Sequence, residues 1–355
     1  MAIFKVEGGR RLRGEITPQG AKNEALQILC ATLLTQEKVI VHNVPQILDV
    51  IQLIELLQAM GVEVERLSEE SYSFRAADID PDYLRSDDYC RRASRLRGSV
   101  MLLGPMLARF GVGYMPKPGG DKIGRRRLDT HFIGFQKLGA KFNFDIADEF
   151  FMVEGKELKG TYMLLDEASV TGTANIVMAA VLAKGSTTIY NAAREPEIVD
   201  LQNFINAMGG NVRGAGGSII TVEGRRALHG GKYRIIADRI VGATYLCAAA
   251  CCGGEVRLRG VDPRPLSTVS GALSEAGCTV KSGEDDVFLQ SDGSLRSIRP
   301  VRTAPYPGFP TDAQPVLMAA LLKSAGSTVF VENIFENRYR HVDELARMGA
   351  EVRVA

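Results

Sequence analysis

Two short polar segments place residue types suited to anion chemistry at the ends of apolar stretches. Lys22 and Asn23, in QGAKNEAL, come just before an apolar helix, so an ammonium group, an amide and a helix N-terminus could act on one anion. The segment 116–131, PKPGGDKIGRRRLDTH, combines prolines, a Gly-Gly pair and three consecutive arginines. This composition favours a flexible lid that closes over a phosphate or carboxylate. For both segments the alternative is a solvated basic surface.

Two further segments carry an aspartate and an arginine. Asp312, in FPTDAQP, directly precedes an apolar run, so taken alone it predicts a helix N-cap. Arg338, in ENIFENRYRH, lies close to Arg340, and each could be a surface charge. Arg97 belongs to a cluster of arginines just before the apolar helix GSVMLLGPML.

The composition is that of a soluble globular protein. Of the 355 residues, 45% are hydrophobic and 24% are charged, which excludes disordered, collagen-like and disulfide-scaffold proteins. At roughly 100 to 200 residues per domain, the length predicts about two domains. The 43 basic and 42 acidic residues leave a net charge of +1, so we expect no nucleic-acid partner and only local anion binding.

Several motifs that would indicate other functions are absent. The sequence has no GxxxxGK[ST] phosphate loop and no GxSxG, and the GAGG at 214–217 lies between NVR and SIITVEG, which predicts a hairpin turn. Four histidines without metal-ligand spacing and six cysteines without a CxxC pair predict no metal site and reduced, packed thiols. No long apolar stretch is present, so we expect no membrane insertion and a cytoplasmic protein.

One unit of roughly 70 residues recurs five times: an apolar helix, a strand, a second helix closing on a hydrophobic-Gly pair, and another strand. The closing pairs are Met60-Gly61, Leu138-Gly139, Met208-Gly209, Ala276-Gly277 and Met348-Gly349. Each glycine suits a left-handed helix C-cap. Helices such as IVMAAVLA and YLCAAACC are predicted to be buried on most sides, with sheets outside them. These repeats predict an α/β fold of two pseudo-symmetric lobes.

In their order and spacing, QGAKNEAL, PGGDKIGRRRLDTH, NAAREPEIVD, DRI, RTAPYPGFPTD and FENRYRHVDEL resemble the UDP-N-acetylglucosamine 1-carboxyvinyltransferases, a family of enolpyruvyl transferases. The resemblance covers essentially the whole chain. It implies a two-lobed inside-out α/β barrel of repeated helix-strand units, with lobe I at 22–236 and lobe II at 1–21 plus 237–355. The family has six units, so we expect the sixth, which carries further phosphoenolpyruvate-binding arginines, to be absent here.

The resemblance implies transfer of the enolpyruvyl group of phosphoenolpyruvate to the 3-hydroxyl of UDP-N-acetylglucosamine, with release of phosphate. This reaction is the first committed step of peptidoglycan synthesis. We expect these two small molecules as substrates and no cofactor, and the sequence leaves open which protein partners the chain has.

Roles carry over residue by residue. Lys22, Asn23 and Arg126 match the phosphoenolpyruvate site; Lys22, Asn23, Asp121, Asp312 and Arg338 match catalytic positions; Arg97, Arg127, Leu128, Asp129, Thr130, Ser169, Val170, Asp312 and Ile334 match the nucleotide-sugar site. Asp312 is expected to be the general base, Asp121 an acid or lid group, and Lys22, Arg126 and Arg338 an electrostatic clamp.

Two residues depart from the family pattern. Asp121 stands where most members carry the lid cysteine that fosfomycin alkylates, so we expect the chain to be insensitive to fosfomycin. Glu167 stands where a lysine that contacts the nucleotide is common. Two alternatives stay open: a catalytically impaired or truncated paralogue that binds UDP-sugar, and the shikimate-pathway enzyme 3-phosphoshikimate 1-carboxyvinyltransferase.

Overall fold

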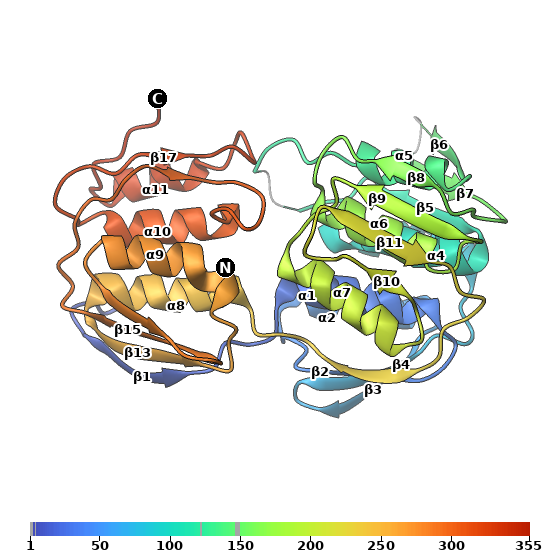
Figure 1. Cartoon of the computed structure of the whole chain (residues 1–355), viewed down its shortest axis with the longest axis horizontal. Coiled ribbons are helices and arrows are strands. Elements are labelled where there is room, and N and C mark those ends of the chain that lie inside the picture. The colour runs from blue at the N-terminus through green and yellow to red at the C-terminus, as the bar shows by residue number, and fades with distance from the viewer. Residues whose placement is uncertain (1–2, 4, 121–122, 146–149) are drawn as a thin grey trace. The chain divides into compact units, whose positions relative to one another are not determined.

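The computed structural model describes residues 3, 5–120, 123–145 and 150–355. The chain forms two compact units (Figure 1). Unit 1 comprises Met1–Gln19, Ile123–Arg125 and Ala237–Ala355, and unit 2 comprises Gly20–Lys122 and Arg126–Ile236. Each unit has its own hydrophobic core.

Unit 2 contains three small sheets around a set of helices (Figure 1). The sheets have the orders β12-β2-β4-β3, β5-β7-β6 and β10-β11-β9-β8. Their strands are β2 (Val39–His42), β3 (Glu63–Ser68), β4 (Ser71–Arg75), β5 (Val112–Pro116), β6 (Lys141–Asp145), β7 (Phe150–Glu154), β8 (Tyr162–Leu164), β9 (Ser186–Tyr190), β10 (Val212–Arg213), β11 (Ile219–Glu223) and β12 (Gly231–Arg234). β10 and β11 pair antiparallel, which confirms the hairpin predicted from GAGG.

The helices of unit 2 contribute many fully buried residues to its core. They are α1 (Lys22–Ala31), α2 (Leu48–Ala59), α3 (Asp87–Ala93), α4 (Leu103–Phe110), α5 (Asp129–Lys137), α6 (Val170–Ala180) and α7 (Pro196–Ala207), with the 3-10 turns η1 (Thr32–Leu34), η2 (Pro81–Arg85) and η3 (Arg97–Leu102). α6 packs against α4 and α5. Its residues from Gly172 to Ala180 are all buried, as its apolar sequence predicted.

Close approach of these helices depends on glycine. A Cβ at position 104 of α4 would lie 2.4 Å from the Asn175 carbonyl oxygen of α6, and one at position 134 of α5 would lie 2.3 Å from Cδ1 of Ile176. Glycine at both positions therefore allows α4 and α5 to pack directly on α6.

Unit 1 contains the sheet β1-β13-β15-β14 and the strand pair β16-β17. Its elements are β1 (Leu12–Ile16), α8 (Arg239–Cys252), β13 (Gly254–Arg259), η4 (Arg264–Leu266), α9 (Ser267–Glu275), β14 (Thr279–Ser282), β15 (Asp286–Ser291), β16 (Val301–Arg302), η5 (Thr311–Ala313), α10 (Gln314–Leu321), β17 (Phe330–Val331) and α11 (Arg340–Arg347). α8 packs against α10 and the inner face of the sheet.

One prediction about α8 is wrong. Tyr245 is 37% exposed, and Cys251 and Cys252 are exposed as well, so the YLCAAACC segment is not buried on most sides. Only the stripe that faces α10 and the sheet is covered, and it includes Leu246 and Ala250. All six cysteines are free, but the prediction of packed thiols fails for Cys251 and Cys252.

The predicted repeat is confirmed by the backbone. The glycine of each of the five closing pairs has a positive φ, between +88° and +111°, and ends a helix. Within one repeat, β8 leads through α6 to its parallel partner β9, and β16 leads through α10 to its parallel partner β17.

Two strands do not pair with the strand that follows them in the chain, and they exchange partners instead. β1 is followed in the chain by α1 and β2 but pairs in parallel with β13, and β12 is followed by α8 and β13 but pairs in parallel with β2. Each unit therefore completes a sheet with a strand that precedes a helix of the other unit in the sequence.

Candidate active site

Lys22 is the first residue of α1 in unit 2, so it lies inside the helix and not just before it as the sequence predicted. Its Nζ lies 2.5 Å from Asp49 Oδ2 in the first turn of α2, and both side chains are partly exposed. Asn23 is exposed on the same turn. The lysine is thus held by a carboxylate that the sequence analysis did not single out, and an incoming anion would compete for the same ammonium group.

Arg97 and Arg126 lie side by side in unit 2. Arg97 Nη2 donates to the Arg126 carbonyl oxygen at 2.9 Å. A Cβ at Gly120 would lie 2.9 Å from Arg97 Cβ and 3.3 Å from Arg126 Nη1, so the glycine lets the loop pass close to both arginines. Burial, followed by the like charge of Arg126, lowers the pKa of Arg97 to about 10. Two adjacent cations that repel each other favour binding of an anion.

Arg127 is surrounded by carboxylates. Its Nε donates to both oxygens of Asp129 at 3.0 Å, its Nη2 pairs with Asp166, and its Nη1 lies 3.7 Å from Glu167 Oε2. Hydrogen bonds to Asp129 and then Asp166 raise the pKa of Arg127. Thr130 Oγ1 joins this cluster, because its single hydroxyl proton can be donated either to Asp166 Oδ1 at 3.2 Å or to Glu167 Oε1 at 3.3 Å. The cluster ties the loop before α5 to the loop before α6.

The start of α6 carries two of the predicted nucleotide residues. Ser169 is its N-cap and accepts from Gly172 N at 3.2 Å, and Val170 is its first residue. Leu128 immediately precedes α5 and is partly buried. The structure therefore brings Arg127 to Thr130 and Ser169 to Val170 to the adjoining N-terminal ends of two packed helices.

Asp312 and Arg338 form an ion pair in unit 1. Arg338 Nη2 donates to Asp312 Oδ1 at 2.6 Å, and the side chains are 14% and 41% exposed, respectively. The prediction of Asp312 as a helix N-cap is wrong, because it lies inside η5 and its side chain makes no cap hydrogen bond to α10. A charge-assisted bond to a guanidinium is stronger than a neutral cap interaction, which explains the orientation of the carboxylate.

Glu332 organises the backbone around this pair. It accepts from Thr303 Oγ1 at 2.8 Å, from Thr311 Oγ1 at 3.0 Å and from Ile334 N at 2.9 Å. One carboxylate thus joins the residue before Asp312 to Ile334, the predicted nucleotide-sugar contact. Glu332 is not among the residues predicted from the sequence, although its place at the head of ENIFENR is a signal that could have pointed to it.

Asp121 and Lys122 of the predicted lid lie outside the described residues. The three residues that follow them, Ile123–Arg125, group with unit 1. There, Asn337 N donates to the Ile123 carbonyl oxygen at 3.0 Å, and Arg125 N donates to Glu336 Oε1 at 2.7 Å.

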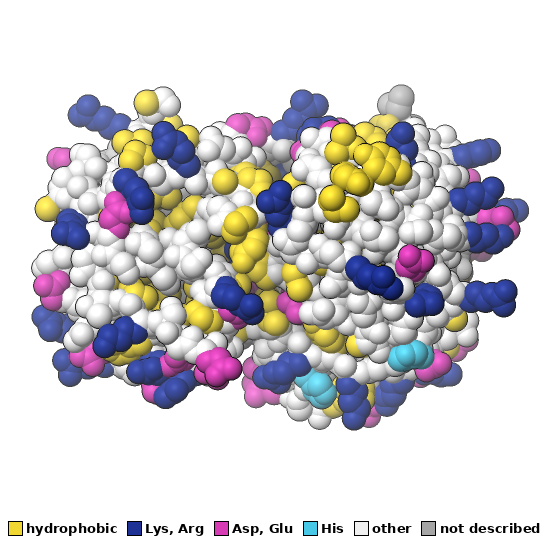
Figure 2. Space-filling model, viewed as in Figure 1, with side chains coloured by type: hydrophobic (Ala, Val, Ile, Leu, Met, Phe, Trp, Pro, Cys, Tyr) yellow, Lys and Arg dark blue, Asp and Glu magenta, His cyan; other side chains and the backbone are white. Residues whose placement is uncertain are grey.

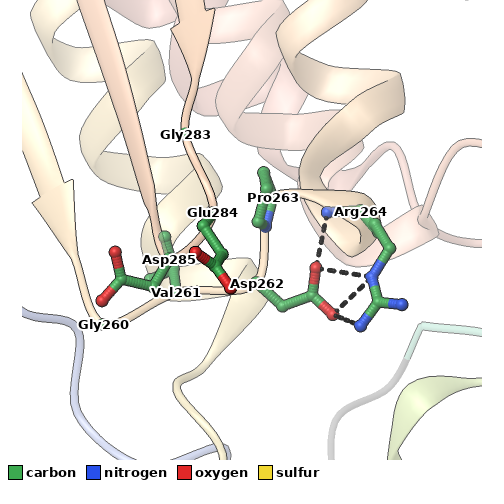
Figure 3. Close-up of a pocket in the computed structure, with 8 residues that line it drawn as sticks. All are labelled: Gly260, Val261, Asp262, Pro263, Arg264, Gly283, Glu284 and Asp285. Atoms are coloured by element: carbon green, nitrogen blue, oxygen red, sulfur yellow. Dashed lines mark hydrogen bonds and ion pairs between the residues drawn. The ribbon is translucent and has the colours of Figure 1, made fainter.

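A separate open pocket in unit 1 contains none of the predicted site residues. It is lined by Gly260, Val261, Asp262, Pro263, Arg264, Gly283, Glu284 and Asp285 (Figure 3). Arg264 is already paired with Asp262, at 2.6 Å between Nη2 and Oδ2. We assign no function to this pocket.

No group of three or more His, Cys, Asp or Glu residues among the described residues is placed to hold a metal ion. None of the helices in the described part of the chain is both long and apolar enough to cross a membrane. On the face shown in Figure 2, basic and acidic side chains are interspersed over the surface.

Comparison with known proteins shows the relatives of this chain. A family model described as EPSP synthase (3-phosphoshikimate 1-carboxyvinyltransferase) matches residues 6–355. A UDP-N-acetylglucosamine 1-carboxyvinyltransferase from Bacteroides fragilis is 48% identical over 359 residues, covering 99% of this chain and 83% of the relative. Proteins of the same name from Bacteroides thetaiotaomicron and Porphyromonas gingivalis are 46% and 43% identical, with the same coverage.

Solved structures show the same fold. The enolpyruvyl transferase NikO from Streptomyces tendae has a TM-score of 0.84 at 20% identity, covering 98% of this chain and 81% of that one. EPSP synthase from Acinetobacter baumannii has a TM-score of 0.65 at 19% identity, covering 91% and 74%.

The repeats and the structural neighbours define an enolpyruvyl transferase fold, as predicted. The chain belongs to the UDP-N-acetylglucosamine 1-carboxyvinyltransferase family.

Proposed function

We propose that this chain transfers the enolpyruvyl group of phosphoenolpyruvate to the 3-hydroxyl of UDP-N-acetylglucosamine and releases phosphate, the first committed step of peptidoglycan synthesis. The observation that carries the proposal is the 48% identity over 99% of the chain to an enzyme of that name. The Asp312–Arg338 pair, at 2.6 Å, and Lys22 at the start of α1 add local support. We place the reaction in the cytoplasm.

The chemistry makes three demands on the protein. The attacking hydroxyl must lose its proton as its oxygen bonds to C2 of phosphoenolpyruvate, and the methylene carbon must gain one. The resulting tetrahedral intermediate then loses a proton from that carbon while its C–O bond to phosphate breaks. Throughout these steps a phosphate and a carboxylate must be stabilised by cations.

Unit 2 supplies the cationic side chains that are proposed to bind phosphoenolpyruvate. Lys22 and Arg126 would bind its phosphate and carboxylate, and Asn23, exposed beside Lys22, would donate its amide to the intermediate. Lys22 would exchange its present partner Asp49 for the substrate. Arg97, in contact with the Arg126 carbonyl oxygen, would border the substrate and keep Arg126 in place.

The nucleotide would bind at the adjoining starts of α5 and α6. The segment Arg127 to Thr130 would line the uridine, and Ser169 and Val170 would contact the nucleotide where helix N-termini favour an anion. Glu167, which stands where a lysine is common in the family, lies beside Arg127. Arg127 is a cation in the same region, and a nucleotide phosphate would have to displace one of its three carboxylate partners in order to pair with it.

Unit 1 supplies the proposed general base. Asp312 is the more exposed member of its ion pair, so its carboxylate can accept the proton of the 3-hydroxyl while Arg338 fixes its orientation. Ile334, held through Glu332, would contact the sugar nucleotide. Asp121 is proposed as the acid or lid group.

The test is a phosphate-release assay with phosphoenolpyruvate and each of two acceptors. We expect phosphate release with UDP-N-acetylglucosamine and none with 3-phosphoshikimate. Release with 3-phosphoshikimate alone would assign the shikimate-pathway reaction. Binding of UDP-N-acetylglucosamine by calorimetry without any phosphate release would assign a binding protein without turnover.

A further inference from the structure

His131 and Asn175 form a fully buried polar pair beneath the proposed nucleotide site. Both residues are 0% exposed. Asn175 Nδ2 lies 2.9 Å from His131 Nδ1, and His131 Nε2 lies 3.1 Å from Thr171 Oγ1. None of the roles assigned above uses either side chain. Polar groups buried in an apolar helix interface cost free energy unless they are hydrogen-bonded, and a fully hydrogen-bonded network fixes the packing more specifically than apolar contacts do.

The hydrogen bonds fix the state of both side chains. Asn175 Oδ1 accepts from Gly104 N at 2.7 Å, and Asn175 Nδ2 donates to the Val100 carbonyl oxygen at 2.7 Å, so the amide cannot be turned round. Its Nδ2 must therefore donate to His131 Nδ1, which leaves the ring proton on Nε2 to be donated to Thr171. The imidazole is neutral, and its orientation is determined by α6.

The pair connects three segments that are far apart in the sequence. Val100 belongs to η3, which begins at Arg97; His131 lies in the first turn of α5, directly after 126–130; Thr171 lies in the first turn of α6, directly after Ser169 and Val170. Every segment of unit 2 that is proposed to touch the nucleotide is thus one turn or less from this network.

We propose that His131 and Asn175 are positioning residues that hold the starts of η3, α5 and α6 at the spacing the nucleotide requires. This inference rests on the proposed function. Hydrogen bonds suit this role because they fix direction as well as distance, whereas an apolar contact would let the helices slide. Gly104 supports the arrangement, since it brings the α4 backbone within reach of Asn175.

The experiment compares full-length variants by calorimetry with UDP-N-acetylglucosamine and by steady-state phosphate release. We expect Asn175→Ala and His131→Leu to weaken nucleotide binding roughly ten- to hundredfold, because small misplacements of binding groups cost that much. The KM for UDP-N-acetylglucosamine should rise by a similar factor while kcat changes little, since the proposed base lies in unit 1. His131→Gln, which keeps a group able to bond Thr171, should recover part of the affinity.

Asn206→Ala is the matched control. Asn206 also uses both ends of its amide on backbone groups, those of Val212, but lies at the end of α7, away from these segments. This variant should lower the melting temperature and leave nucleotide affinity unchanged. Equal affinity in Asn175→Ala and the unaltered protein, with only a lower melting temperature, would overturn the inference.

A second measurement does not depend on catalysis or on nucleotide binding. Amide hydrogen exchange of the free protein should increase at 127–131 and 169–172 in Asn175→Ala and in the milder Thr171→Val, but not in Asn206→Ala. Unchanged exchange at both segments would overturn the inference. Failure of the unaltered protein to bind UDP-N-acetylglucosamine, with increased exchange in the variants, would count against the proposed function and not against the positioning role.

Discussion

Arg338 donates a hydrogen bond of 2.6 Å to Asp312, and the arginine is much the more buried of the two, at 14% against 41% exposed. The carboxylate is therefore presented toward solvent on a fixed support. The resemblance implies that Arg338 belongs to an electrostatic clamp on the substrate, whereas its contact in the structure is with the proposed base. Orientation of Asp312 is the role that this contact supports.

Asp312→Asn should bind UDP-N-acetylglucosamine but lose turnover by roughly a hundredfold or more, because a positioned general base contributes that much. Phosphate release and nucleotide binding are measured on the same preparation. Asp262→Asn is the control, since Asp262 is also paired with an arginine of unit 1, Arg264, but lies in the pocket to which we assign no function. Equal turnover in Asp312→Asn and Asp262→Asn would exclude the base role.

Glu167→Gln should bind UDP-N-acetylglucosamine about two- to fivefold more tightly, since it removes one of three carboxylates around Arg127 and exposed ion pairs contribute energies of that order. Calorimetry at low ionic strength measures the change. Glu157→Gln removes an exposed carboxylate paired with Lys184 elsewhere in unit 2 and should leave the affinity unchanged. Weaker binding by Glu167→Gln would show that Glu167 itself contacts the nucleotide.

His131 should make stability fall in mild acid. Burial, with a further contribution from Arg97 and opposed by Asp129, lowers the pKa of His131 to about 3 from its ordinary 6.5. Between about pH 6.5 and pH 3 the imidazole of His131 is therefore protonated in the unfolded chain but not in the folded chain. Because the unfolded chain binds the extra proton, the free energy of unfolding decreases as the pH falls through this window.

The loss attributable to His131 at pH 5 is about 2 kcal/mol relative to pH 7. Urea unfolding of the unaltered protein and of His131→Asn at both values measures it, because other titrating groups contribute to both proteins. The unaltered protein should lose about 2 kcal/mol more than the variant. The same pH dependence in both would mean that the ring is protonated in the folded state.

Fosfomycin should not inactivate this protein lastingly. The resemblance implies that the drug alkylates a lid cysteine, and Asp121, in that position, offers a carboxylate that is a poorer nucleophile than a thiolate. Intact-protein mass spectrometry should show no adduct on the unaltered chain and a stable adduct on Asp121→Cys. The exposed Cys251 and Cys252 serve as an internal control, because they should remain unlabelled in both. Labelling of Asp121 in the unaltered protein would contradict the prediction.

The sequence was sufficient for features that depend on local pattern. The helix-closing glycines, the apolar helices of unit 2 and the hairpin at 214–217 each follow from neighbouring residues, and the structure confirms them. The segments that carry Lys22, Arg126 and Asp312 were likewise visible as polar residues beside apolar runs, although no observation yet tests their roles.

Partners that meet only through tertiary packing could not be predicted. Asp49 joins Lys22 because α2 begins beside α1, and Asn175 joins His131 because α6 packs on α5 through Gly134. The wrong prediction for Asp312 has the same origin. The FPTDAQP segment is compatible with an N-cap, but the Asp312 carboxylate accepts a hydrogen bond from Arg338, which lies in a loop distant in the sequence. Likewise, the exposure of Tyr245 depends on which face of α8 is covered, which its apolar composition does not reveal.

The exchange of β1 and β12 has a consequence for folding during synthesis on the ribosome. Once residues up to 236 have emerged from the ribosome, every strand of unit 2 is available, including β12, so that unit can fold before the rest of unit 1 is made. β1, in contrast, pairs with β13, in the register Leu12 to Gly254. It therefore stays unpaired while all of unit 2 is translated. Glycine at position 14 and the charged residues Arg13 and Glu15 suit a strand that must stay soluble during that wait, since charge on an unpaired edge discourages aggregation.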